Sequence, residues 1–230
     1  MRQRVLTEVQ GEKIVSLESA AAQGNQGAFY LSSGVHGDEP GAAWGLLAWA
    51  ESNFVRLRQE AFLIFPCLNP WGLMANTRAD HRGLDINRRF HIEDDEICGP
   101  WRLALAGRRC RLGLCLHEDY DAQGCYIYEL SHLQRPAGHA ILEKCARVIP
   151  PDPRRKIDGR STQGGVIRRR TPPADLPGMP EAIVLHQLGC PMTLTFETPS
   201  EFSLDERVQT QADFITAALS YAPSLEDAAP

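Results

Sequence analysis

The sequence predicts an α/β fold: a single domain built on a mixed, mostly parallel central sheet with helices on both faces. Two observations favour this class. Segments typical of strands alternate along the chain with segments typical of helices, as in βαβ units. Residues 61–68 (AFLIFPCL) form a short, continuously apolar run, which is typical of a strand covered on both faces. The chain is long enough for one sizeable core, so we expect residues 1–230 to form one domain.

The expected strands are short runs that alternate between apolar and polar residues or are apolar throughout. Residues 13–18 (KIVSLE) are of the alternating kind, and residues 28–35 (AFYLSSGV) end beside Gly34. The complete set of expected strands is 13–18, 28–35, 61–68, 111–117, 124–130 and 192–197.

The first expected helix covers residues 40–59, where apolar residues recur at helical spacing and Pro40 suits the first turn. Residues 69–100 show little periodicity, and so long a connection is usually functional. Residues 150–180 are rich in proline, glycine and arginine and are expected to be irregular. The remaining expected helices are 137–149, 181–189 and 204–221.

The composition is that of an ordinary soluble globular protein, with 43% hydrophobic residues, 23% charged residues and a net charge of −5. It does not favour a protein that coats nucleic acid or an anionic membrane. No apolar run approaches the ~20 residues of a transmembrane helix, and none follows the N-terminal arginines as in a secretory signal. The seven cysteines include no CxxC pair, which favours a reducing compartment. We therefore expect a cytoplasmic protein without nucleic-acid or membrane partners.

Chemically reactive side chains follow three of the expected strands. The segments are GVHGDE at 34–39, LCLHED at 114–119 and LTFET at 194–198. In α/β sheets, ligands bind at the carboxyl ends of the strands. The three segments are therefore expected to converge on one site.

A metal site is the chemistry that these segments favour. His36 and Glu39 are three residues apart where a strand turns into a helix, and Gly34 and Gly37 allow a tight bend. His117, from another strand, would complete three protein ligands and leave one position for water, as in a catalytic zinc site. Each signal alone is weak, because acidic residues can simply stabilise the start of a helix and a single histidine is more often a core residue.

The ordered set of motifs gives the stronger signal. It resembles the zinc carboxypeptidases, the carboxypeptidase A-like family, which also contains the succinylglutamate desuccinylase and aspartoacylase branches. The resemblance covers roughly residues 28–200 and implies the phosphorylase/hydrolase-like α/β fold of that family. The motifs are SGVHGDEPG at 33–41, NPWG at 69–72, Arg78, DINRRF at 85–90, His117 and FETP at 196–199.

The resemblance implies one zinc ion held by His36, Glu39 and His117. Zinc lowers the pKa of a bound water towards ~7, which makes a usable nucleophile. Glu197 would be the general base, and its place at the end of an apolar strand would raise the pKa of its carboxyl group.

The resemblance also assigns residues that would contact the substrate. Arg78 matches the position that stabilises the negative oxygen of the tetrahedral intermediate, although Arg82 lies close to it in the sequence. Asn87 and Arg88 match the pair that binds the terminal carboxylate, for which the planar guanidinium is well suited. Asp85 is expected to brace this segment.

The match is incomplete in one respect. The better-known carboxypeptidases carry a tyrosine on a mobile loop before the catalytic glutamate, but residues 150–180 contain no tyrosine. Tyr126 and Tyr128 are the candidates for substrate binding. We expect one of them to face the site and the other to face the core. The arginines of the 150–180 stretch form a basic cluster, and this cluster is either a solvated loop or a determinant for acidic substrates.

The first functional interpretation is a zinc metallocarboxypeptidase that hydrolyses the C-terminal amide bond of a small peptide. The alternatives are a deacylase of N-acyl amino acids, with the same metal and base, and a non-catalytic metal-binding relative. A second metal is a further possibility, with Asp38, Glu118 and Asp119 as acidic neighbours of the ligands. The sequence leaves open the natural substrate and the oligomeric state.

Overall fold

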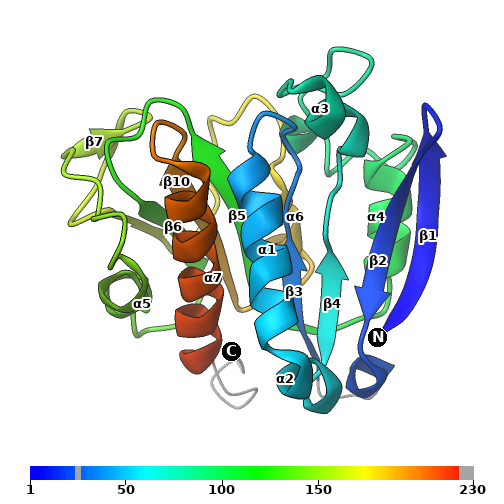
Figure 1. Ribbon diagram of the computed structural model, residues 1–230, viewed down its shortest axis with the longest axis horizontal. Helices are drawn as coiled ribbons and strands as arrows, with labels where there is room; N and C mark the ends of the chain where they lie inside the picture. Colours follow the sequence, from blue (N-terminus) through cyan, green and yellow to red (C-terminus); the bar gives the residue numbers. More distant parts are fainter. Residues whose placement is uncertain (24–26, 223–230) are drawn as a thin grey trace.

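The computed structural model describes residues 1–23 and 27–222 and has the predicted α/β architecture. An eight-stranded sheet has the order β1-β2-β4-β3-β5-β10-β6-β9 (Figure 1). The pairs β4–β3, β3–β5, β5–β10 and β6–β9 are parallel, whereas β1–β2, β2–β4 and β10–β6 are antiparallel. The prediction of a mixed, mostly parallel sheet is therefore confirmed.

The strands of this sheet are β1 (Arg2–Val9), β2 (Glu12–Glu18), β3 (Ala28–Ser32), β4 (Phe62–Phe65), β5 (Cys110–Asp119), β6 (Tyr126–Ser131), β9 (Val166–Arg169) and β10 (Met192–Pro199). A separate hairpin consists of β7 (Lys156–Ile157) and β8 (Arg160–Ser161). The α-helices are α1 (Pro40–Ser52), α2 (Phe54–Gln59), α3 (Pro70–Ala75), α4 (Cys98–Leu105), α5 (Gly138–Cys145), α6 (Glu181–Gln187) and α7 (Leu204–Ser220). Two 3-10 turns are η1 (Ala20–Gln23) and η2 (Ile86–Arg88). In the described part of the chain, no helix is long and apolar enough to cross a membrane.

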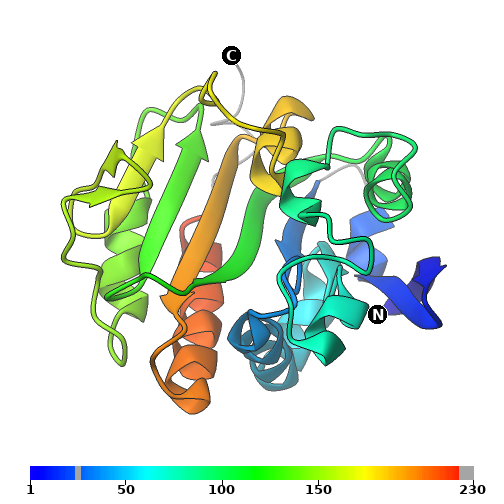
Figure 2. The same cartoon turned by 90° about the horizontal axis from the view of Figure 1, so that it is seen from above.

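Helices cover both faces of the sheet, as predicted. Helices α1, α5 and α7 lie on one face, and α4 and α6 lie on the other (Figures 1 and 2). Side chains along each strand alternate between these two layers. In β3, Phe29 and Leu31 pack towards α1 and α7, whereas Tyr30 packs towards α4 and α6. In β5, Leu114 packs towards α1 and α7, whereas Cys115 packs towards α4 and α6. Consecutive residues further along this strand therefore also face opposite layers.

The strand order brings β3, β5 and β10 side by side at the centre of the sheet, although long stretches of sequence separate them. All three are parallel, so their carboxyl ends lie at one edge. These are the strands that precede the three reactive segments.

Some elements lie outside the sequence-based prediction. Strand β1 is an edge strand whose side chains are mostly exposed, so it lacks an apolar pattern. The short helix α3 lies within the expected connection 69–100, and α4 begins at the end of that connection and extends beyond it. Strand β9 lies within 150–180, where glycine and proline obscure periodicity. The expected helix 40–59 is two helices, because the chain turns at Asn53, whose side-chain amide donates to the Trp49 carbonyl at 2.8 Å.

Candidate metal centre

Three side chains meet at the carboxyl edge of the central strands. His36 and Glu39 lie in the turn between β3 and α1, and His117 lies near the end of β5. One ligand atom from each of the three lies within 4.8 Å of the others. All three side chains are buried, with relative exposures of 2%, 4% and 2%.

Glu39 lies between the two imidazoles. Its Oε1 is 2.5 Å from Nδ1 of His36, and its Oε2 is 2.8 Å from Nδ1 of His117. Two imidazole nitrogens and a carboxylate oxygen are a donor set typical of catalytic zinc. The residues present therefore fit a zinc ion.

Two glycines make the turn between β3 and α1 possible. Gly34 has a φ of +60°, a left-handed conformation that favours glycine. A Cβ atom on Gly37 would lie 1.9 Å from the backbone carbon of Gly72 in α3. The Gly37 amide also donates to the Thr77 carbonyl at 3.0 Å. The turn is therefore packed tightly against α3, which fixes the backbone on either side of His36.

The charges of the ligands are strongly coupled. Burial lowers the pKa of His36, but Glu39 and Asp85 outweigh this effect and raise it to about 9. For Glu39, burial raises the pKa, but the two imidazoles outweigh this effect and lower it to about 2. The Glu39 carboxylate therefore stays ionised near neutral pH, and protons compete with a cation for the His36 imidazole.

Asp85 orients His36 from the other side of the ring. Its Oδ1 is 3.1 Å from Nε2 of His36 and accepts the Asn87 amide at 2.8 Å. Its Oδ2 accepts from Arg78 at 3.2 Å. A carboxylate on the second nitrogen fixes the orientation of an imidazole ligand. Asp85 thus braces its own turn, as expected, and also holds His36.

Glu197 lies beside the three ligands on the neighbouring strand. It is paired with His117 in the parallel register of β5 and β10, and with Tyr126 in the antiparallel register of β10 and β6. Burial raises the pKa of Glu197 well above its usual value, and the nearby Glu39 carboxylate adds to this effect. Within residues 1–23 and 27–222, its carboxylate makes no hydrogen bond or ion pair.

The two arginines that are close in sequence bind different partners. Arg78 lies at the site, with Nη1 at 3.5 Å from Oε1 of Glu39, and its side chain is 47% exposed. Arg82 instead binds Asp80 at 2.6 Å and Asp95 at 3.0 Å. Of the two, Arg78 is therefore the one that could contact a substrate at the candidate centre.

Asn87 and Arg88 lie in the η2 turn that Asp85 starts. Oδ1 of Asn87 accepts the backbone amide of Glu181 at 3.0 Å, and its side-chain NH2 group has no acceptor among the described residues. Arg88 donates from Nη1 to the Asn87 carbonyl at 2.9 Å, and its side chain is 37% exposed. Both residues therefore offer donors suited to a carboxylate.

Glu181 is a residue that sequence reasoning did not single out. It is fully buried in the first turn of α6, and its carboxylate accepts from Tyr30 and, at 2.7 Å, from Ser32. Its backbone amide holds Asn87. The available signal was an acidic residue at the start of the expected helix 181–189, and such residues are common enough that this signal is weak.

The expectation that Tyr126 and Tyr128 face opposite ways is wrong. Residues two apart in a strand point to the same face, and the two rings pack edge to face with centroids 5.5 Å apart. Tyr126 donates to Asp119 at 2.9 Å and Tyr128 to Asp158 at 2.6 Å. Both rings lie on the face of the sheet that carries Glu197.

One acidic neighbour of the ligands and two arginines of the basic cluster form ion pairs within the fold. Glu118 faces the opposite layer from His117 and binds Arg207 at 2.9 Å, so it does not join the ligands. Arg168 binds the buried Glu129 at 2.9 Å, and Arg154 binds Asp152 at 2.7 Å. In a second group of possible ligands, Asp80, His81 and Glu96, both carboxylates already bind the Arg82 guanidinium.

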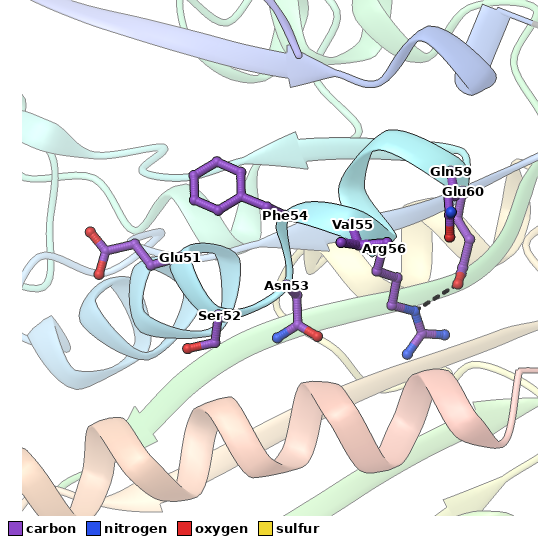
Figure 3. A pocket seen from close by; sticks show the side chains of 8 residues that line it. All are labelled: Glu51, Ser52, Asn53, Phe54, Val55, Arg56, Gln59 and Glu60. Carbon is purple, nitrogen blue, oxygen red and sulfur yellow. Dashed lines mark hydrogen bonds and ion pairs between the residues drawn. The ribbon is translucent and has the colours of Figure 1, made fainter.

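A shallow pocket elsewhere lies at the junction of α1 and α2 (Figure 3). Its lining includes Asn53, Phe54 and the Arg56–Glu60 ion pair at 2.8 Å. This junction is at the C-terminal end of α1, whereas Glu39 precedes its N-terminal end. A helix of this length separates the two by about 20 Å, so the pocket is not part of the candidate centre.

The fold is similar to that of several solved proteins. A provisionally named metallopeptidase from Shewanella amazonensis matches with a TM-score of 0.84 at 20% identity, over 97% of this chain and 87% of that one. A metallo-carboxypeptidase from Pseudomonas aeruginosa, in complex with (2-guanidinoethylmercapto)succinic acid, matches with a TM-score of 0.67 at 16% identity, over 98% and 64%. The murein-tripeptide amidase MpaA from Escherichia coli O157 matches with a TM-score of 0.61 at 16% identity, over 94% and 90%. At these identities the likeness establishes the fold. A search of curated proteins returns no match.

The fold and the site together define a carboxypeptidase-like α/β protein with a candidate metal centre at the carboxyl ends of its central strands. Residues 25–139, half of the chain, match the model of the succinylglutamate desuccinylase/aspartoacylase catalytic domain. The chain therefore belongs to this family. The resemblance seen in the sequence is confirmed.

Proposed function

We propose that the chain, residues 1–230, is one catalytic domain of a zinc-dependent metallocarboxypeptidase that hydrolyses the C-terminal amide bond of a small peptide. One observation carries the proposal. The buried cluster of His36, Glu39 and His117 lies directly beside Glu197, whose carboxylate has no partner in the described chain. A carboxylate next to a metal site suits metal-assisted hydrolysis, because it can accept a proton from the attacking water.

His36, Glu39 and His117 would hold one zinc ion. When bound, zinc supplies a Lewis acid that activates water near neutral pH and polarises the carbonyl group. The protein residues prepare this site in two ways. Glu39 stays ionised between the two imidazoles, and Asp85 holds the ring of His36 in one orientation.

Glu197 would act as the general base. Because burial raises the pKa of its carboxyl group, Glu197 can hold a proton taken from water and then deliver it to the leaving amine. The absence of a competing hydrogen bond among the described residues leaves the carboxylate available for this transfer.

Three further side chains would orient the substrate. The Arg78 guanidinium lies close enough to Glu39 to stabilise negative charge on the reacting carbonyl oxygen, an effect worth several kcal/mol in the barrier. The side-chain NH2 group of Asn87 and the partly exposed guanidinium of Arg88 would bind the terminal carboxylate. Tyr126 and Tyr128 would line the side of the site next to Glu197.

The family match favours a second candidate function, deacylation of an N-acyl amino acid. Such a substrate also has an amide bond and a free carboxylate, so the same residues would serve it. The two functions differ in what lies on the acyl side of the amide: a peptide in the first case and a small acyl group in the second.

A substrate panel with a matched control separates the two. The zinc-loaded protein is assayed with short peptides, with the same peptides amidated at the C-terminus, and with N-acetyl and N-succinyl amino acids. The first proposal predicts cleavage of the free peptides, at least 100-fold slower cleavage of the amidated ones, and loss of activity in His117→Ala. If only the acyl amino acids were cleaved, the carboxypeptidase proposal would be wrong and the deacylase function would stand. No hydrolysis by zinc-loaded protein would contradict both.

A further inference from the structure

The buried side of α7 carries polar residues where an apolar stripe would be expected, and Arg207 and Gln211 are two of them. Arg207 and Gln211 are four residues apart, so they lie on the same side of the helix as Phe214 and Ala218. Gln211, Phe214 and Ala218 are completely buried. Burying a polar side chain costs free energy unless it is hydrogen-bonded, so Arg207 and Gln211 are expected to have hydrogen-bond partners.

Helix α1 is shaped to let both residues reach the sheet. A Cβ atom on Gly45 would lie 2.3 Å from Cβ of Gln211. A Cβ atom on Gly41 would lie 2.4 Å from Oε1 of Glu118 and 3.1 Å from Cβ of Arg207. Two glycines one turn apart on α1 therefore leave the space that these polar side chains occupy.

Gln211 ties together the ends of two central strands. Its Nε2 donates to the backbone carbonyl of His117 at 2.7 Å and lies 3.0 Å from Oγ1 of Thr198. His117 is a candidate metal ligand on β5, and Thr198 directly follows Glu197 on β10. One side-chain amide thus links the strand of a ligand to the strand of the candidate base.

Arg207 extends the same link to α1 through Glu118. Nη1 of Arg207 binds the two carboxylate oxygens of Glu118 at 2.9 and 3.0 Å. Oε2 of Glu118 accepts the amide of Gly41 at 2.8 Å, and its Oε1 accepts from Oγ1 of Thr198 at 3.3 Å. Gly41 is two residues beyond Glu39, so this network also holds the start of α1.

The Gln211 amide contacts the backbone of His117 itself, and the other contacts involve residues one or two positions from Glu39, His117 or Glu197. Side chains alternate along a strand, so Glu118 and Thr198 point towards α7 while His117 and Glu197 point towards the site. The contacts set the relative positions of three elements that contribute to the site, without touching the substrate or the metal.

We propose that Gln211 and Arg207 of α7 are positioning residues of the metal centre, which hold the ends of β5, β10 and α1 in register behind the ligands. The inference rests on the proposed function, since it assigns these residues to the zinc site. If these residues had a purely structural role, their substitution would lower the free energy of unfolding and speed exchange throughout the molecule. A positioning role lowers zinc affinity and loosens the two strand ends selectively.

The test compares Gln211→Met, which keeps the length of the side chain and removes the amide donor, with Phe214→Leu, which perturbs the core on the same helix. Hydrogen–deuterium exchange of the metal-free proteins is measured in peptides from β5 and β10. Zinc affinity is measured by competition with a chromophoric chelator. For Gln211→Met we expect faster exchange at 116–119 and 196–199, and zinc affinity about 10-fold weaker.

Phe214→Leu is expected to change exchange more broadly and to leave zinc affinity within about 2-fold of the native value. Thr198→Val, which removes one acceptor of the Gln211 amide, is the second variant and should weaken zinc binding in the same direction. Unchanged zinc affinity and unchanged exchange in Gln211→Met or Thr198→Val would overturn the inference. If the native protein bound no zinc, the proposed function would fail, and the exchange data would still decide whether Gln211 holds the strand ends.

Discussion

Glu39 is the residue on which the geometry of the candidate centre depends. Its two oxygens are both used: Oε1 faces His36, and Oε2 accepts the Glu118 amide at 3.1 Å in addition to facing His117. A carboxylate held in this way cannot rotate freely. The side chain is therefore presented to a cation in one orientation, which lowers the entropic cost of assembling the site.

Glu197 gives the sharpest prediction at the scale of a single residue. Glu197→Gln keeps the size of the side chain but removes its ability to accept a proton. Loss of a general base costs about 10²- to 10⁴-fold in rate, so we expect kcat to fall by that factor. Zinc affinity should stay within a few-fold of the native value, because Glu197 is not one of the three ligands.

The measurement is steady-state kinetics on the best substrate of the panel, together with the chelator competition. Glu201→Gln is the matched control, since Glu201 is exposed and lies just beyond the end of β10. Its kcat should be unchanged. A Glu197→Gln variant with native kcat would show that another group takes the proton.

At the scale of elements, the turn between β3 and α1 depends on its contact with α3. Gly37→Ala would place a Cβ atom 1.9 Å from the Gly72 backbone, so the turn or α3 must move. Overpacking of this kind typically costs about 1–3 kcal/mol in the free energy of unfolding. Because His36 and Glu39 lie in the same turn, zinc affinity should fall as well.

Urea unfolding of the metal-free protein and the chelator competition measure these two effects. Gly107→Ala is a useful control, because its added Cβ atom has no neighbour within 4 Å, although its φ of +71° also disfavours alanine. This variant should lose stability and keep native zinc affinity. Native zinc binding in Gly37→Ala would mean that the turn is not constrained by α3.

The elements also show how far sequence reasoning extends. All six expected strands are present within a few residues, because buried strands carry continuous or alternating apolar residues. The segments that bear His36, His117 and Glu197 could be placed at strand ends for the same reason. Contacts such as Gln211 with the His117 carbonyl could not be predicted, since they join residues distant in the chain and follow no local pattern.

That Tyr126 and Tyr128 face the same side of the sheet could have been predicted from the sequence, because side chains alternate along a strand with a period of two residues. The different partners of Arg78 and Arg82 could not, because they depend on the fold of a long connection. There, Asp80 and Asp95 bind Arg82 and leave Arg78 to the site.

At the scale of the whole molecule, the candidate centre and a second titratable group occupy opposite edges of the sheet. His186 lies at the end of α6, near the start of β10, whereas Glu197 lies near the other end of that strand. The His186 ring is buried and stacks on His132 with centroids 3.8 Å apart. Neither of its ring nitrogens has a hydrogen-bond partner in the described chain.

This arrangement predicts how stability depends on pH. Burial, with a smaller effect of His132, lowers the pKa of His186 to about 4 in the folded protein, whereas an unfolded histidine has a pKa of about 6.5. Between these values the unfolded chain binds more protons, so stability rises with pH through this window and is lost as the pH falls from about 6.5 towards 4. The expected contribution between pH 7 and pH 5 is about 2 kcal/mol.

His186→Phe keeps an aromatic ring against His132 and removes the titrating nitrogens. Urea unfolding at pH 5 and pH 7, for the native protein and the variant in metal-free form, measures the contribution. The difference in unfolding free energy between the two pH values should be about 2 kcal/mol smaller in the variant. The two proteins differ at this one side chain, so groups away from the His132–His186 pair contribute alike to both curves. An identical pH dependence would mean that the His186 ring is charged, or exposed to solvent, in the folded state.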